Sequence, residues 1–333
     1  MRILWLYMFK ANYNFDSWLH MEVVRYLKGH PGVEIVAYGP GLRNAYPALT
    51  KMEYDPNYTM ESLYSFSPFD VVIVNTKSRC FEFYNPKTKQ YSPTWLPPNF
   101  ASWKKTPKIV IEEDYHYETD DDWYREMKID LILQRHYSQV ARQQHVPMKW
   151  LPFSVDTSVF NPSKQFCDVR GKRVSLPETG GRQKKFAMVG NDADQAYIYR
   201  RTAITKLIEV GIGASYSGSK KVDGEYVEIL RQFLGYVSCG STYDICAAKN
   251  LEIMASGGIL FTNRFKGIDL LFPKGTYVAY QDDGSDIVVK AQQVLNDPKF
   301  RHYLLAQAHN CIQQRHTHEI RSQEMVTIIE GMG

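Results

Sequence analysis

The chain has 333 residues, 44% hydrophobic and 23% charged, which excludes a disordered or fibrous chain and fits two α/β domains of about 150 residues each. No apolar run reaches the roughly 20 residues that span a bilayer, so a cytoplasmic protein is expected, and five scattered cysteines without a Cys-x-x-Cys pair exclude a disulfide framework and structural zinc. The net charge of +4 suits a phosphate-rich ligand but does not by itself indicate nucleic-acid binding.

The first part of the chain predicts a β-α-β start. Arg2–Phe9 is a buried strand, Trp18–Lys28 has a helical apolar period, and Glu34–Tyr38 is a second strand. Strands that alternate with helices predict a parallel sheet covered on both faces. Three more strands follow, at Val71–Asn75, Lys108–Glu112 and Leu131–Gln134. Between them, Phe81–Trp103 lacks a clear period and is expected to be a long functional loop.

A second α/β series follows an interdomain connection. The stretch WLPFSVDTSVFNP is extended and apolar, and Ser163–Lys185 after it is polar and basic. The expected strands of the second series are 185–190, 214–217, 236–239, 258–262 and 276–280, and its expected helices are 196–210, 226–234, 247–255, 285–295, 299–317 and 319–330. The series is of the same α/β type as the first.

The sequence therefore predicts two Rossmann-like domains with parallel sheets that face a central cleft. The expected parts are an acceptor-side domain at 1–155, a hinge at 156–185, a nucleotide-sugar-binding domain at 186–316, and a final helix at 317–333 that crosses back to the first domain. No Gly-x-Gly-x-x-Gly follows the first strand, which argues against a dinucleotide oxidoreductase. The residues expected to line an acceptor pocket there are Asn12, Tyr13 and Asn14.

The most informative stretch is Ser241–Arg264, STYDICAAKNLEIMASGGILFTNR, in which seven residues separate the acids Asp244 and Glu252. A helix that begins within Ala247–Asn250 presents N–H groups and its positive dipole end to a diphosphate, and Lys249 adds charge. Glu252 is placed to accept hydrogen bonds from both ribose hydroxyls. The plainer alternative makes Asp244 a helix N-cap and Glu252 a surface acid.

This stretch resembles the donor motif of the retaining GT-B glycosyltransferases, which is an acid, seven residues, and a Glu before a Gly-containing turn. The likeness is closer to the CgeB-like, spore-protein-type branch. Its cues are VGN at Val189–Asn191, then Arg200 and Arg201, the segment AKNLEIMASGGILFTN, and HTHEIR at His316–Arg321. LPFSVDTSVFNP at Leu151–Pro162 is similar to the hinge of this superfamily, and the cues together cover about half of the chain.

The resemblance implies transfer of a hexose from a UDP- or GDP-linked donor to a hydroxyl, with retention and without a metal or other cofactor. Asp244 would contact the donor sugar and act in catalysis, and Glu252 would bind the ribose. The other donor-binding residues implied are Gly190, Asn191, Arg200, Arg201, Lys206, Lys249 and Asn250. Because Asp244 replaces the usual Glu, its shorter side chain decides between an active transferase and a protein that only holds its donor.

A second candidate site is Ile109–Trp123, IVIEEDYHYETDDDW, where a strand runs into His116. Parallel sheets bind ligands at the carboxyl ends of their strands. The superfamily that this sequence resembles has a His at this place near the acceptor. The resemblance therefore makes His116 a candidate catalytic residue that assists deprotonation of the acceptor hydroxyl. A purely structural histidine is the alternative.

Two aspartate patterns are similar to the metal motif of the other large glycosyltransferase fold. Asp120–Asp122 is instead expected to begin a helix, and Asp192 and Asp194 to cap a loop, because a second α/β series after a hinge is not part of that fold. His316 and His318 alternate, which does not place them on one helix face for a metal site.

Several functions stay open alongside hexose transfer to a glycan, small-molecule or protein hydroxyl. The basic linker Lys164–Lys185 is compatible with a viral-type glucosyltransferase that acts on modified bases in DNA. Asp244 in place of Glu is compatible with a catalytically silent protein that binds a nucleotide sugar or glycan. An epimerase on the same fold is the third alternative.

Overall fold

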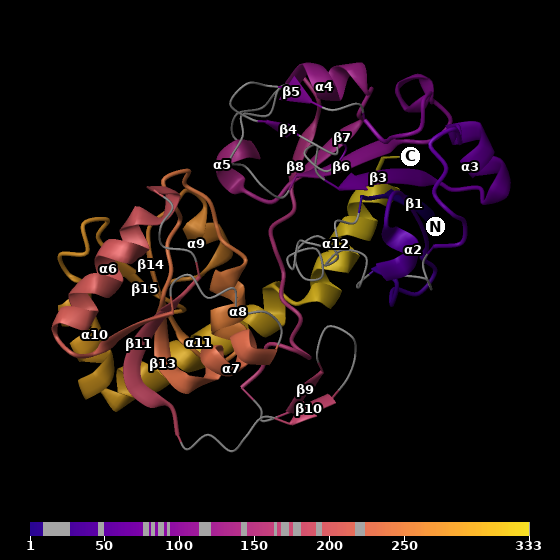
Figure 1. Cartoon of the computed structure of the whole chain (residues 1–333). Helices are drawn as coiled ribbons and strands as arrows, with labels where there is room; N and C mark the ends of the chain where they lie inside the picture. The colour runs from indigo at the N-terminus through magenta and orange to yellow at the C-terminus, as the bar shows by residue number, and fades with distance from the viewer. Residues whose placement is uncertain are drawn as a thin grey trace. The chain divides into compact units, whose positions relative to one another are not determined.

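The structure is a computed structural model that describes residues 1–8, 27–45, 50–75, 80, 84–85, 90–91, 94–112, 121–140, 145–162, 165–167, 173–175, 181–190, 195–216 and 224–332. The chain divides into two compact units (Figure 1). Unit 1 consists of Met1–Pro152 together with Arg321–Gly333, and unit 2 is Phe153–Ile320. Within the part of the chain that is described, no helix is both long and apolar enough to cross a membrane.

Unit 1 is built on a six-stranded parallel sheet with the order β2-β1-β3-β6-β7-β8. Its strands are β1 (Arg2–Leu6), β2 (Glu34–Tyr38), β3 (Val71–Asn75), β6 (Lys108–Glu112), β7 (Leu131–Gln134) and β8 (Met148–Trp150). The five strands predicted for this half are confirmed, with β1 shorter than expected. The sixth, β8, falls where an extended connection was predicted, because three residues are too few to show a period.

The alternation of side chains along these strands divides the core of unit 1 into two layers. On one face, Trp5, Ile73 and Ile111 pack with Met325 and Ile329 of α12 (His318–Glu330). The opposite face is covered by α3 (Met60–Phe66), the 3-10 helix η3 (Phe100–Ser102) and α4 (Asp121–Glu126). The last part of α12 therefore contributes to the core of unit 1, although it follows unit 2 in the chain.

The remaining elements of unit 1 are short. They are the helices α2 (Leu42–Ala45) and α5 (Tyr137–Val140) and the antiparallel pair of β4 (Tyr84–Asn85) with β5 (Gln90–Tyr91). This pair lies within the segment predicted as a long loop.

Lys108, at the start of β6, is an almost fully buried ammonium group. Only 2% of Lys108 is exposed, and Nζ donates to the carbonyl oxygens of Phe100 and Met127 at 3.2 and 2.7 Å. Burial lowers the pKa of Lys108 to about 8, although Asp130 opposes this shift. The ammonium group thus links the first residue of η3 and the residue after α4 to the start of β6. Lys108 therefore lies at the amino-terminal edge of the sheet, whereas parallel sheets bind ligands at the carboxyl-terminal edge.

We expect the free energy of unfolding of the wild type to rise relative to Lys108→Met by about 2 kcal/mol between pH about 8 and about 9.5. In this range the unfolded chain keeps the Lys108 proton and the folded chain has lost it, so increasing pH favours the folded state. All six tryptophans precede residue 153, so urea unfolding followed by tryptophan fluorescence reports on unit 1. Parallel pH profiles for the two proteins would contradict this account of Lys108.

Unit 2 is built on a five-stranded parallel sheet with the order β12-β11-β13-β14-β15. Its strands are β11 (Gln183–Val189), β12 (Gly213–Tyr216), β13 (Phe233–Val237), β14 (Ile259–Asn263) and β15 (Val278–Tyr280). Its helices are η4 (Gln195–Tyr197), α6 (Ile198–Glu209), α7 (Gly224–Gln232), α8 (Lys249–Ala255), α9 (Ile268–Leu271), α10 (Ile287–Asn296) and α11 (Pro298–Arg315). The predicted series is confirmed with small shifts at the ends, and the short helix α9 was missed.

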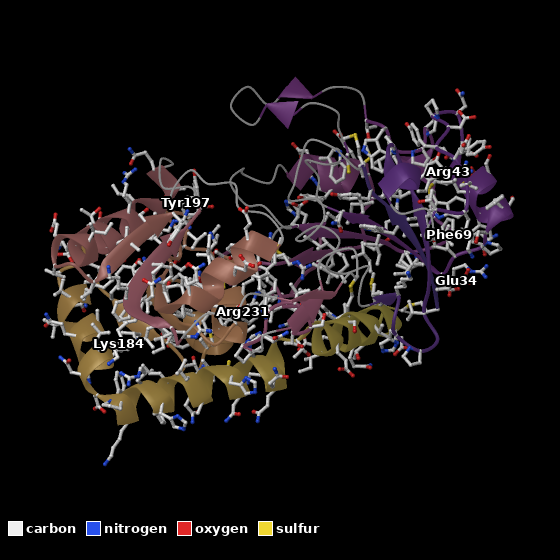
Figure 2. The ribbon with its side chains drawn as sticks, turned by 60° about the horizontal axis from the view of Figure 1, so that its bottom comes forward. Glu34, Arg43, Phe69, Lys184, Tyr197 and Arg231 are labelled. Atoms are coloured by element: carbon white, nitrogen blue, oxygen red, sulfur yellow. The ribbon has the colours of Figure 1, made fainter. Side chains whose placement is uncertain are left out.

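Two arginines fix the start of unit 2 to its helices. Nε and Nη2 of Arg231, labelled in Figure 2, donate to the backbone and side-chain oxygens of Asn161 at 2.8 and 3.0 Å. Arg182 donates to the carbonyls of Leu230 and Phe233 at 3.1 and 2.8 Å, and to that of Ser256. Between these anchors the predicted hinge contains a small antiparallel pair, β9 (Gln165–Cys167) with β10 (Arg173–Ser175).

Candidate functional site

The candidate site lies in unit 2, where the order of the strands reverses. β11 pairs with β12 on one side and with β13 on the other, so the connections after β11 and β13 leave in different directions. Open parallel sheets bind ligands at such a point, beyond the carboxyl ends of the strands. The residues that follow these two strands, Gly190 and the segment 238–248, are therefore where a ligand is expected.

Gly190 and two cations meet directly beyond β11. Gly190 has a φ of +111°, which favours glycine, and Nζ of Lys249 donates to the carbonyl oxygen of Val189 just before it. A Cβ atom on Gly190 would overlap this Nζ and would lie 3.8 Å from Nη2 of Arg200. The absence of a side chain at Gly190 therefore lets α6 and α8 bring their cations to one place.

The ammonium group of Lys249 and the guanidinium group of Arg200 repel each other. Burial and the neighbouring Arg200 lower the pKa of Lys249 to about 8, while Glu252 opposes the shift. Arg200 is 4% exposed, and its guanidinium lies 4.0 Å from the centroid of the Tyr197 ring. An aromatic ring at this distance stabilises a cation. Two positive charges so close together attract a polyanion.

Glu252 lies three residues after Lys249 on α8 and is half-buried. The hydroxyl of Tyr226 on α7 donates to its Oε2 at 2.5 Å. Burial and this carboxylate raise the pKa of Tyr226 well above its usual value, so the hydroxyl stays protonated. The Glu252 carboxylate is thus held by Tyr226 on the same helix as Lys249.

Asp244 is exposed and organises the loop after β13. Its φ is +60° and that of Ser241 is +55°, two left-handed residues in one short segment. Oδ1 of Asp244 accepts from the backbone N–H of Lys266 at 2.6 Å, which joins this loop to the turn after β14. The alternative that Asp244 caps the helix is wrong, because α8 begins at Lys249 with Ala248 at its N-cap.

At the start of α8, backbone N–H groups are available to a ligand, whereas the side-chain amide of Asn250 is not. Among the described residues, the N–H groups of Ala247, Ala248 and Lys249 donate no hydrogen bond. Asn250 is 0% exposed, and its Nδ2 donates to Sγ of Cys246 at 3.7 Å. Its buried Oδ1 has no partner within the described part of the chain. The buried Asn250 side chain is therefore not placed to contact a nucleotide-sugar donor, whereas the backbone N–H groups of Ala247, Ala248 and Lys249 are.

The structure brings together four of the predicted donor-binding residues, Gly190, Arg200, Lys249 and Glu252. Arg201 is half-buried on α6 beside Arg200. Lys206 lies farther along α6, and its Nζ donates to the carbonyl of Asp283 in the loop between β15 and α10 at 2.8 Å. Its predicted contact with the donor stays a prediction.

The other predicted site residues lie outside the described residues. These are Asn12, Tyr13, Asn14, His116 and Asn191, and with them the aspartates Asp192 and Asp194. Asp122, from the other aspartate pattern, lies in the first turn of α4 as predicted.

The two histidines of the tail contact different groups. Nε2 of His316 hydrogen-bonds the carbonyl of Leu271 at 2.9 Å, and Nδ1 of His318 hydrogen-bonds Oγ of Ser154 at 3.1 Å. Within the ranges that the structure describes, no group of three or more His, Cys, Asp or Glu side chains is placed to hold a metal ion.

Sequence reasoning missed two parts of the polar architecture. Tyr226 precedes its partner Glu252 by 26 residues, and no spacing rule connects them.

In unit 1, the central strands each end in a buried polar residue, Asn75, Glu112 and Gln134, after an otherwise apolar run. That pattern is visible in the sequence and marks the carboxyl edge of the sheet. Oε1 of Glu112 accepts from the hydroxyl of Tyr124 at 2.7 Å.

Comparisons with known proteins agree with this architecture. Residues 180–327 match a family described as "Glycosyl transferase-like", and no curated protein matches the chain. A glycosyltransferase from Rickettsia africae has a TM-score of 0.66 at 9% identity, over 99% of this chain and 98% of that chain. An alpha-glucosyltransferase in complex with UDP-glucose and DNA containing an abasic site has a TM-score of 0.63 at 10% identity, over 99% and 98%. Anabaena HepE in complex with UDP and glucose has a TM-score of 0.62 at 11% identity, over 99% and 100%.

The predicted fold is confirmed as two parallel-sheet, Rossmann-like domains that match GT-B glycosyltransferase structures. The likeness to the solved structures shows the fold, and residues 180–320 of the family match lie in unit 2, which carries the cationic site. The chain thus has the GT-B fold, and its residues 180–327 are glycosyltransferase-like.

Proposed function

We propose that the protein transfers a hexose from a UDP- or GDP-linked donor to a hydroxyl acceptor, with retention of configuration and without a metal ion. The observation that carries the proposal is a pair of cations, the buried Arg200 and the half-buried Lys249, beside Gly190 and the half-buried Glu252. Two of the structurally similar proteins are complexes with UDP or UDP-glucose, which makes UDP the first donor nucleotide to test.

Each of these residues has a proposed part in the reaction. Glu252 accepts from the ribose hydroxyls, and the N–H groups at the start of α8 contact the diphosphate. Cleavage of the bond between the sugar and the phosphate oxygen delivers charge to the diphosphate, which Arg200 and Lys249 stabilise. These side chains supply the positive charge that a divalent cation supplies in other transferases. Asp244 contacts the hydroxyls of the hexose.

The acceptor side of the proposal belongs to the first domain. His116 assists the deprotonation of the acceptor hydroxyl, and Asn12, Tyr13 and Asn14 contribute to the acceptor pocket. The hydroxyl belongs to a glycan, a small molecule or a protein. Closure of the two domains around the reactants would exclude water and favour transfer over hydrolysis.

Glu252→Ala is expected to weaken binding of the donor nucleotide by about 10- to 100-fold, because a hydrogen bond to a charged group contributes about 1.5–3 kcal/mol. Isothermal titration calorimetry with UDP and GDP measures this change. Glu209→Ala is the matched control, since Glu209 is an exposed acid at the end of α6. An unchanged nucleotide affinity in Glu252→Ala would disprove the ribose assignment.

The transfer reaction itself is tested by following the release of nucleoside diphosphate from UDP- and GDP-hexoses. The proposal predicts that release accelerates when a glycan, small-molecule or protein acceptor is added and that the product carries the hexose with its original anomeric configuration. Acceleration by duplex DNA alone would favour the DNA-modifying alternative. An inverted product would disprove retention.

A further inference from the structure

One short hydrogen bond between Tyr226 and Glu252 connects α7 to α8. The hydroxyl of Tyr226 donates to Oε2 of Glu252 at 2.5 Å, and its raised pKa keeps the proton on the tyrosine. A hydrogen bond between a hydroxyl and a carboxylate is stronger than one between neutral groups. This contact therefore restricts the rotation of the Glu252 side chain.

The tyrosine ring is itself fixed by contacts on two sides. Phe160, in the segment that leads into unit 2, meets it edge-on with ring centroids 6.1 Å apart and an interplanar angle of 75°. Nζ of Lys249 lies 5.8 Å from the centroid of the Tyr226 ring. The ring thus contacts the same lysine that is proposed to bind the diphosphate, so Tyr226 lies between the entry segment and the donor site.

We propose that Tyr226 is a positioning residue that sets the selectivity of the site for ribonucleotides. By engaging Oε2, it directs Oε1 of Glu252 toward the 2′ and 3′ hydroxyls of the donor. A site that hydrogen-bonds a hydroxyl discriminates against an analogue that lacks it, because the analogue cannot form that hydrogen bond. This inference rests on the proposed function, since it requires that Glu252 binds ribose.

The test compares each ribonucleoside diphosphate with its 2′,3′-dideoxy counterpart, using UDP and GDP, in the wild type and in Tyr226→Phe. The wild type is expected to prefer the ribonucleotide by more than tenfold. In Tyr226→Phe the preference should fall by about tenfold, with the affinity for the dideoxynucleotide almost unchanged. In the Glu252→Ala background, which removes the acceptor of this hydrogen bond, Tyr226→Phe should change the preference little, because the two residues act as one unit.

Tyr277→Phe is the matched control, because the Tyr277 hydroxyl also donates to a carboxylate, Oδ1 of Asp269, at 3.4 Å. If Tyr226→Phe unfolds at the assay temperature, Phe160→Leu replaces it, since it removes the contact that fixes the ring and keeps the hydroxyl. An equal loss of affinity for both nucleotides, or an unchanged preference, would overturn the role of Tyr226 and leave the proposed function intact. If neither UDP nor GDP binds the wild type, the proposed function fails and this inference fails with it.

Discussion

Lys249→Met is expected to lower kcat for hexose transfer by about 100-fold or more, which is the usual effect of removing one group that stabilises developing charge. The methionine keeps the length of the side chain but removes the ammonium group beside Gly190 and Arg200. Steady-state kinetics with the preferred donor measure the change. Because the charge on the diphosphate grows as the bond breaks, kcat should fall more than KM rises.

The pH dependence of the same variant separates charge from packing. The pKa of Lys249 is lowered to about 8, so in the wild type the ammonium loses its proton as the pH rises through this value. Donor affinity should therefore be highest below pH about 8 and decrease above it, and Lys249→Met should lack this decrease. Lys290→Met is the matched control, since Nζ of Lys290 also donates to a strand carbonyl, that of Ala279, at 2.6 Å. Equal losses in the two variants would show that packing alone matters.

Gly190→Ala is expected to weaken donor binding by tenfold or more, because its Cβ would displace the ammonium group of Lys249. Its φ of +111° adds strain of about 1–3 kcal/mol, which should lower the Tm of unit 2 by several degrees. Calorimetric titration and thermal unfolding measure the two effects separately.

Gly211→Ala is the control for Gly190→Ala. Gly211 also has a positive φ, +77°, but a Cβ there would meet nothing within 4 Å. We therefore expect Gly211→Ala to lower the Tm and leave donor affinity unchanged. If both variants weaken donor binding equally, the contact between Gly190 and Lys249 is not what organises the site.

Much of the fold could be predicted from the sequence, because its strands are short apolar runs bounded by turns. Val71–Asn75 and Lys108–Glu112 are examples in which period and length agree, and both are strands. β8 and α9 were missed because elements of three or four residues are too short for a period to appear. In the predicted hinge, the polar composition concealed the pair of β9 and β10.

Spacing alone predicted the site only where its residues are close in sequence, and Gly190 and Arg200 were implied by the resemblance. Lys249 and Glu252 are one helical turn apart, so their shared surface follows from the spacing. The contact of Lys249 with Val189 spans 60 residues, and that of Tyr226 with Glu252 spans 26. Contacts of this kind depend on the order of the strands, which the sequence pattern does not determine. Similarly, the bond from Lys266 to Asp244 depends on how the turns after β13 and β14 meet.

The central claim is that unit 2 binds a nucleotide sugar through Gly190, Arg200, Lys249 and Glu252. The most direct test is a thermal-shift measurement on the intact chain with UDP-, GDP-, ADP- and CMP-linked hexoses, because a ligand that binds only the folded state raises the Tm, and more so the tighter it binds. We predict that a UDP- or GDP-hexose raises the Tm and that Lys249→Met and Glu252→Ala greatly reduce this shift. If none of the four donors raises the Tm, or if the shift persists unchanged in both variants, the claim is wrong.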